Sequence, residues 1–118
     1  MELGDKRHVS RTFGAAEVED FARLTGSPVD GAVPEPLVAA MFSYLLGVKL
    51  PGPGTNYLKQ EMRFLAPAPV GQPLMASVEV TRVRPEKHLV DLWASCATED
   101  GTVVCEGRSL VLVKDVGA

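Results

Sequence analysis

Metal-binding side chains are scarce in this chain of 118 residues. It has two cysteines and two histidines, and His8 and His88 are remote from Cys96 and Cys105 along the chain. Structural zinc sites usually take four such ligands at short spacings, so we expect no metal centre. Because the chain shows no export signal and has only two cysteines, we expect reduced thiols in a cytoplasmic protein.

Basic residues and long apolar runs are also few. Lysine and arginine number 12 against 15 acidic residues, which gives a net charge of −3. A nucleic-acid-binding protein usually shows a basic footprint, and none is present. The longest apolar stretch, residues 36–48, is shorter than the roughly 20 residues of a membrane span and is typical of a buried helix. We therefore expect neither a nucleic-acid nor a membrane partner.

The remaining pattern is that of one globular domain over residues 1–118. Hydrophobic residues make up 46% and charged residues 23%, an ordinary globular composition. Apolar spacing predicts a strand at 7–13, a short amphipathic helix at 15–24, and a nearly all-apolar helix at 36–46. From residue 55 onward the period changes to two and predicts strands at 55–65, 73–84, 88–98 and 102–114. A buried helix followed by an antiparallel meander predicts the α+β class.

The pair Asp100-Gly101 between two alternating runs is a strong hairpin signal. A two-residue turn there sets Cys96 opposite Cys105, and the two thiols are then able to form a disulfide under oxidation, without a functional role. On the same apolar face, the predicted pairs are Leu92 with Ser109 and Val90 with Val111. On the opposite face, they are Ser95 with Glu106, Trp93 with Arg108, and Asp91 with Leu110.

Three segments carry a family resemblance: residues 33–47 (VPEPLVAAMFSYLLG), residues 50–60 (LPGPGTNYLKQ) and residues 64–71 (FLAPAPVG). They resemble the MaoC-like hot-dog family, particularly R-specific enoyl-CoA hydratases and 3-hydroxyacyl dehydratases. The resemblance covers about Phe13 to Val113 and implies an antiparallel sheet wrapped around a central helix. It also implies an acyl thioester of coenzyme A or of a carrier protein as ligand, with no cofactor besides. The partner it implies is a second copy in a homodimer, or a catalytic paralogue in a heterodimer.

The chain departs from the family at the hydratase motif, Asp-x-Asn-Pro-x-His, which follows a Ser/Thr-Gly pair. Here Thr25-Gly26 is followed by Ser27 where the catalytic aspartate is expected, and the Asn-Pro-x-His part is absent, as if the loop were deleted. Glu35 occupies the position of a glycine whose N–H resembles an oxyanion donor. Thr55 stands where many relatives carry Ser or Thr beside the site.

Hydration of an enoyl thioester needs an acid and a base, each worth typically 10²–10⁴-fold. Without the Asp–His pair, we expect a thioester-binding protein that is weak or inactive as a hydratase on its own. The alternative is an active hydratase, dehydratase or thioesterase that uses Glu35, with Thr55 and ordered water. Glu35 also fits a simpler role, as a first-turn acid favoured by the helix dipole. Asp30, before Gly31, is expected to be a turn residue.

The candidates for binding the substrate are Ser27, Pro34, Met41, Gly54 and Tyr57. For Met41, core filling is the favoured alternative. Tyr57 alternates with Lys59, Glu61 and Arg63, which predicts that these four share one face of a strand. Four cations near strand ends either contact coenzyme A phosphates or form an ordinary charged outer face: Arg63, Arg82, Arg84 and Lys87.

Overall fold

The computed structural model describes residues 1–28 and 31–113 and contains one sheet and one long central helix. The strands and helices are β1 (Lys6–Thr12), α1 (Ala15–Thr25), α2 (Glu35–Tyr44), η1 (Leu45–Lys49), β2 (Asn56–Phe64), β3 (Pro73–Arg84), η2 (Pro85–Lys87), β4 (Leu89–Thr98) and β5 (Val103–Leu112). The five strands are antiparallel in the order β1-β3-β4-β5-β2, which confirms the α+β prediction. Asp30 and the predicted end of the last strand at residue 114 lie outside the described residues.

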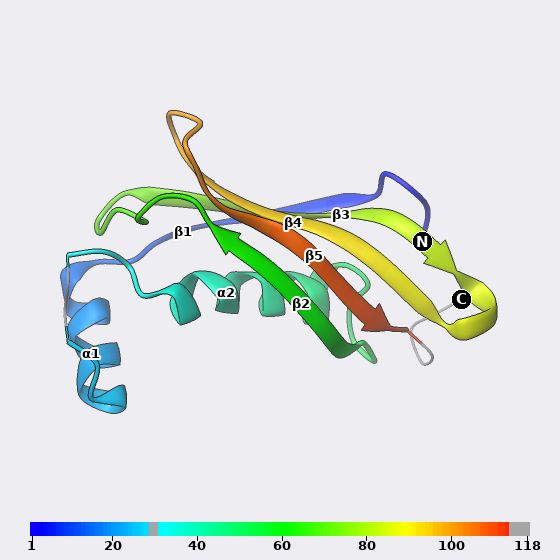
Figure 1. The fold of residues 1–118 in the computed structure, drawn as a ribbon, viewed down its shortest axis with the longest axis horizontal. Helices are drawn as coiled ribbons and strands as arrows, with labels where there is room; N and C mark the ends of the chain where they lie inside the picture. The colour runs from blue at the N-terminus through cyan, green and yellow to red at the C-terminus, as the bar shows by residue number, and fades with distance from the viewer. Residues whose placement is uncertain (29–30, 114–118) are drawn as a thin grey trace.

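The central helix lies along the concave side of the arched sheet (Figure 1). The sheet covers the side of the helix that bears its buried residues, Val38, Met41, Phe42, Leu45 and Leu46. The predicted helix at 36–46 is longer in the structure, because a π-helical turn, η1, continues α2 to Lys49 before Pro51 interrupts it. The sheet and the central helix pack into one core, whose largest fully buried side chains are Phe42, Leu45, Leu46, Leu74, Leu92, Val38, Val78, Val80, Val90, Val104, Val111 and Cys96.

Helix α1 contributes little to this core. Val18 is its only buried residue, and Leu24 is 87% exposed. The helix ends at Gly26, whose φ of 75° provides the left-handed cap expected from the Thr-Gly pair. Figure 1 shows α1 projecting beyond one end of the sheet. Helix α1 therefore lies mostly outside the packed centre.

The β4–β5 hairpin confirms the predicted register in its body but not at its tip. Ala97 pairs with Val103, one residue out of step with the strands below, and leaves Val104 as an extra residue. The turn is therefore a three-residue loop over 99–101 followed by a bulge, with Gly101 at φ 90°. Below the bulge all six predicted pairs are present: Cys96–Cys105, Leu92–Ser109, Val90–Val111, Ser95–Glu106, Trp93–Arg108 and Asp91–Leu110.

Strand β2 corrects the predicted alternation at Tyr57. Its pairing with β5 shifts between Tyr57 and Lys59, so Leu58 is an extra residue in the ladder. One inserted residue moves a side chain to the other face of a sheet. Tyr57 consequently leaves the face of Lys59 and joins the inner face, where its hydroxyl lies 3.4 Å from the Oγ of buried Ser109.

Candidate functional site

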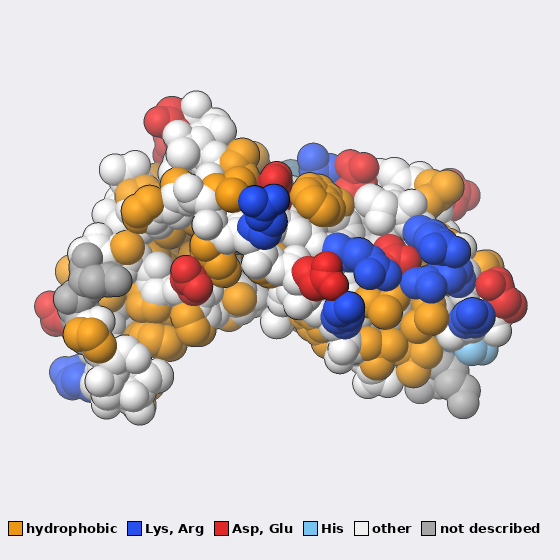
Figure 2. Space-filling view, viewed as in Figure 1, with side chains coloured by type: hydrophobic (Ala, Val, Ile, Leu, Met, Phe, Trp, Pro, Cys, Tyr) orange, Lys and Arg blue, Asp and Glu red, His pale blue; other side chains and the backbone are white. Residues whose placement is uncertain are grey.

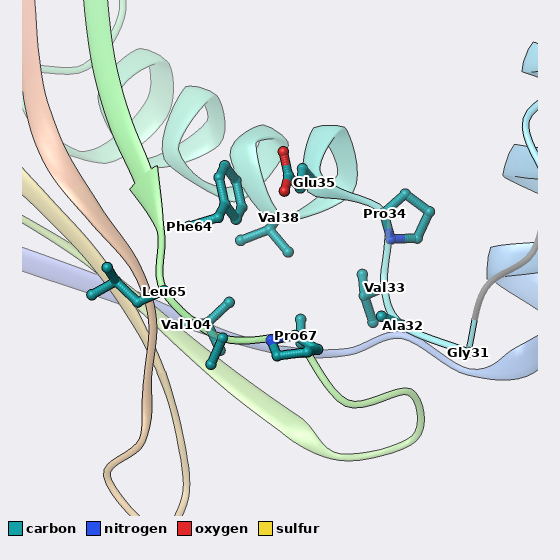
Figure 3. Close-up of a pocket in the computed structure, with 12 residues that line it drawn as sticks. Gly31, Ala32, Val33, Pro34, Glu35, Val38, Phe64, Leu65, Pro67 and Val104 are labelled. Atoms are coloured by element: carbon teal, nitrogen blue, oxygen red, sulfur yellow. The ribbon is translucent and has the colours of Figure 1, made fainter.

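A pocket of about 630 Å³ lies at the first turn of α2, where Glu35 begins the helix. Its walls come from the helix entry, from the segment that follows β2, and from β5 (Figure 3). Val38, one turn further along α2, is fully buried and lies at its apolar side, with Phe64 on the strand across from it. The full lining is Gly31, Ala32, Val33, Pro34, Glu35, Val38, Phe64, Leu65, Ala66, Pro67, Ala68 and Val104.

Local backbone contacts fix the position of Glu35. The N–H of Val33 donates to the carbonyl oxygen of Ala68 at 2.9 Å, and Ala32 forms a bridge with Pro69. These contacts attach the helix entry to the segment after β2. Proline suits a helix start because its missing N–H has no helical partner there, and the two prolines that flank Glu35 set the direction of the first turn.

The electrostatic surroundings of Glu35 are a helix N-terminus and a buried thiol pair. A helix N-terminus favours a carboxylate, and the structure gives Glu35 no ion pair within the described residues. The hydrogen bond between Cys105 and Cys96 raises the pKa of the Cys105 thiol and lowers that of Cys96, and burial and the charge of Glu35 raise the Cys105 value further. A protonated, fully buried Cys105 is a poor nucleophile.

Neither histidine reaches this pocket. His8 is exposed on edge strand β1, and His88 is exposed after η2 with a φ of 57°. The pocket lining has Glu35 as its only titratable side chain. Within the described residues there is also no group of three or more His, Cys, Asp and Glu placed to hold a metal ion. Among the described residues, Glu35 therefore has no second proton-transfer group beside it.

The structure does not bring Thr55 and Glu35 together within one chain. The Thr55 hydroxyl donates to the carbonyl oxygen of Gly52 at 2.6 Å, just before β2 begins. Phe64, at the other end of β2, lines the Glu35 pocket. Eight residue steps at about 3.3 Å separate those ends by about 26 Å. Thr55, Gly54 and Tyr57 thus form a separate group at the far end of the central helix.

The other two predicted substrate-binding residues also lie elsewhere. Met41 lines a second pocket, of about 540 Å³, between β1 and α2. Ser27 is exposed in the loop after α1, where its N–H donates to the Thr25 hydroxyl at 3.3 Å. Of the five candidates, Pro34 alone shares the pocket with Glu35. The sequence analysis did not identify Phe64, Leu65 and Val104 as lining residues of the Glu35 pocket. They reach it because Phe64 of β2 pairs with Cys105 of β5.

Arg84 has a structural partner on the outer face of the sheet. Asp91 is 4% exposed and accepts from Arg84 Nη2 at 2.7 Å and from Arg108 Nε at 2.6 Å. Lysine and arginine side chains gather over the end of the sheet where β2 begins and β3 ends (Figure 2). Arg82 and Lys87 are exposed there and stay candidates for phosphate contacts.

Comparison with known proteins decides the family. No family model matches the chain. An (R)-specific enoyl-CoA hydratase of Aeromonas caviae is 37% identical over 126 residues, with 94% of each chain covered. The chain belongs to the family of the (R)-specific enoyl-CoA hydratases. A 3-hydroxybutyryl-CoA dehydratase of Methylorubrum extorquens is 30% identical, with 96% of this chain and 81% of that protein covered.

A solved structure confirms the fold of this chain. The (R)-hydratase from A. caviae involved in PHA biosynthesis matches with a TM-score of 0.90 at 35% identity, covering 96% of this chain and 97% of that chain. The MaoC-like hot-dog fold expected from the sequence is thereby confirmed. No helix among the described residues is long and apolar enough to cross a membrane.

The lengths of these alignments contain further information. The alignment with the A. caviae hydratase spans 126 positions, yet 94% of 118 residues is about 111. The alignment with the M. extorquens dehydratase spans 128 positions, and 96% of this chain is about 113 residues. In both alignments, about 15 positions of the relative have no matching residue in the present chain.

Proposed function

We propose that this chain binds acyl thioesters as an (R)-hydratase relative and is weak or inactive as a hydratase on its own. The observation that carries this proposal is the connection between α1 and α2. Only nine residues, 26–34, join Thr25 to Glu35. This segment holds no histidine and no asparagine, and Asn56 is the single asparagine of the chain, so the sequence Asp-x-Asn-Pro-x-His occurs nowhere in it. Both alignments contain about 15 positions without a residue from this chain, as a deletion within it requires.

The loss of both proton-transfer groups accounts for low turnover. Water addition needs a base for the attacking water and an acid for the α-carbon. Groups that act as a unit fail together, so the remaining binding contacts give little hydration by themselves. Ser27, at the aspartate position, offers a hydroxyl whose proton is not removed near neutral pH, and it lies outside the Glu35 pocket.

The Glu35 pocket supports the ligand class. Its volume of about 630 Å³ lies within the usual range for small-ligand sites, and Val38, Phe64 and Val104 give it an apolar wall. The names of the relatives point to coenzyme A thioesters, of an enoyl group in one and of a 3-hydroxybutyryl group in the other. An acyl-carrier-protein thioester presents the same acyl group. We infer that the chain takes one of these as ligand and needs no further cofactor for binding.

Assembly follows from the part of the inner face that the chain leaves open. Strands β4 and β5 bury their inner residues completely, whereas on edge strand β2 the inner residues are only partly covered: Tyr57, Gln60, Met62 and Phe64. A second hot-dog chain can cover them. A homodimer or a heterodimer with a catalytic paralogue fits, and light scattering on the purified chain, alone and mixed with such a paralogue, distinguishes the two.

A thioesterase is the second candidate, because the structure places the Glu35 carboxylate in the lining of an apolar pocket. A carboxylate there is able to activate water toward a thioester carbonyl, a general-base step. The test measures crotonyl-CoA hydration and acyl-CoA hydrolysis for the wild type and Glu35→Gln. Glu19→Gln, an exposed helix carboxylate outside the pocket, is the matched control.

Each result has a definite meaning. Calorimetric binding of acyl-CoA with negligible turnover supports the main proposal, and no binding at millimolar ligand contradicts it. Hydrolysis that Glu35→Gln abolishes and Glu19→Gln leaves intact establishes the thioesterase. Robust hydration that is unaffected by Glu35→Gln contradicts both candidates.

A further inference from the structure

The outer face of the sheet carries a row of residues, one from each strand, in which charge alternates about a central tryptophan. The strand pairings set each member directly beside the next. Read from β1 to β2 across the sheet, the row is Lys6, Glu79, Trp93, Arg108 and Glu61. Its charge pattern is plus, minus, neutral, plus, minus. A half-turn about the central strand therefore exchanges every charge with one of opposite sign.

Trp93 is exposed without an evident reason in an isolated chain. It is the only tryptophan, and 46% of its surface is accessible. Met75, on the same face, is 51% exposed. A hollow of about 540 Å³ lies beside Trp93 and is bounded by Arg63, Glu106 and Arg108. Exposed aromatic side chains ringed by charged groups are typical of binding surfaces rather than of solvated sheet faces.

Two of the four charged members of the row have a partner within the chain, since Arg108 donates to Asp91 and Glu61 pairs with Lys59, and two do not. Neither Lys6 nor Glu79 forms an ion pair with another described residue, although the two lie opposite each other. Glu61 does pair with Lys59, at 2.9 Å, and this contact lowers its pKa. Charges of both signs are interleaved over the visible strands in Figure 2. A partner for this face must present the same alternation in reverse order.

We infer that the partner is a second copy of this chain, packed outer face to outer face about a two-fold axis parallel to the strands. That axis sets Lys6 against the partner's Glu61, Glu79 against the partner's Arg108, and Trp93 against the partner's Trp93. An axis along the row instead sets Lys6 against the partner's Lys6 and is disfavoured. Sheets stack face to face about 10 Å apart with strands nearly aligned. Both axes allow this alignment, and the charges select the first.

This surface is distinct from the open inner face of β2, so the two assemblies are independent. Because Trp93 is the sole tryptophan, its emission reports on this face directly. We expect the emission to shift to shorter wavelength, and quenching by acrylamide to fall, as the concentration of wild-type protein rises. Sedimentation should show the mass doubling over the same range.

Charge exchange gives the decisive test. Lys6→Glu and Glu61→Lys each create two like-charge contacts per interface, because the symmetry repeats them. Each should weaken association by about tenfold. The double variant Lys6→Glu/Glu61→Lys restores opposite charges and should regain wild-type association. Glu19→Lys and Lys49→Glu make the same charge changes on the helices and serve as controls.

Three outcomes overturn the inference: Trp93 emission that does not depend on concentration, single variants that associate like wild type, or a double variant that stays as weak as the single variants. Lys6 and Glu61 lie on the two opposite edge strands, so their mutual rescue is not expected from pairing along one edge. Loss of acyl-CoA binding leaves these readouts unchanged, so the proposed function is tested separately.

Discussion

Gly107 is the position at which the structure predicts the largest effect of a single methyl group. It lies on β5 opposite Met62 of β2. A Cβ atom added there meets the carbonyl oxygen of Glu61 at 1.7 Å, the Glu61 carbonyl carbon at 2.7 Å and Met62 Cα at 2.8 Å. All three are backbone atoms, so no side-chain rotation relieves the overlap.

The magnitude follows from the distance that β2 must move. Real Cβ contacts stay beyond about 3 Å, so the strand must retreat by more than about 1.3 Å. Hydrogen bonds of about 2.9 Å then stretch past their useful length. Losing about two ladder bonds at about 1 kcal/mol each, with a further 1–3 kcal/mol from strain, gives about 3–5 kcal/mol for Gly107→Ala. At about 4 °C per kcal/mol, Tm should fall by about 12–20 °C.

Urea and thermal unfolding followed by circular dichroism measure this change. Gly47→Ala is the matched control, because a Cβ at Gly47 meets nothing within 4 Å and Gly47 lies in the η1 helical turn. Alanine is a better helix former than glycine, so that variant should be unchanged or slightly more stable. A Gly107→Ala protein as stable as Gly47→Ala refutes the close approach of β5 and β2.

Three smaller effects follow from buried and half-buried groups. Asp91→Asn should lower the free energy of unfolding in urea by about 1–3 kcal/mol, because it weakens a buried acceptor of two arginines. The control Asp20→Asn removes an exposed ion pair with Arg23 and should cost under about 1 kcal/mol. Equal losses in the two variants contradict this prediction. Burial raises the pKa of Tyr57 above 10.0, so stability should fall as pH rises past that value, and the fall should be smaller in Tyr57→Phe. The raised pKa of Cys105 and its burial should keep it unlabelled by iodoacetamide at pH 8 until the protein opens, and rapid labelling of native protein contradicts that.

The sequence predicted the parts of the fold that depend on alternation and turn chemistry. The Asp100-Gly101 pair located the hairpin, and the separation of apolar from charged positions set its register correctly through six pairs. Three bulges, after Tyr57, after Val80 and after Cys96, escaped prediction. A bulge adds one residue without changing composition, and its presence depends on how neighbouring strands twist together. The bulge after Tyr57 is the reason why that side chain lies on the inner face.

The candidate site was predicted less well, for a physical reason. Glu35 and Thr55 were expected to act together, but a helix of about fifteen residues separates them and leaves Thr55 at the far end of that helix, before β2. Six residues further along the same helix, Met41 lines a different pocket from Glu35. The true neighbours of Glu35 come from strand pairing across the sheet, which local spacing does not encode.

The packing explains how a hydratase relative can lose its motif and keep its fold. The buried core cluster begins at Val33 and ends at Val111, and of the residues described between 14 and 32 only Val18 is buried. Residues in that stretch contribute little to the burial that stabilises the domain. In the proposed function, the missing motif belonged to this same stretch. Its removal then costs chemistry rather than stability, because functional loops sit on a scaffold that folds without them.

A graft tests this separation. Replacing residues 27–32 with a longer segment that carries Asp-x-Asn-Pro-x-His should change the free energy of unfolding by about 1 kcal/mol or less, since doubling a loop costs only about 0.6 kcal/mol. The grafted chain should hydrate crotonyl-CoA, and a matched graft with Asn and Gln in place of the motif Asp and His should bind it without turnover. A graft that unfolds shows that the short connection is itself part of the packing. A stable graft whose activity equals that of its matched control shows that the pocket had diverged beyond the loss of the acid–base pair.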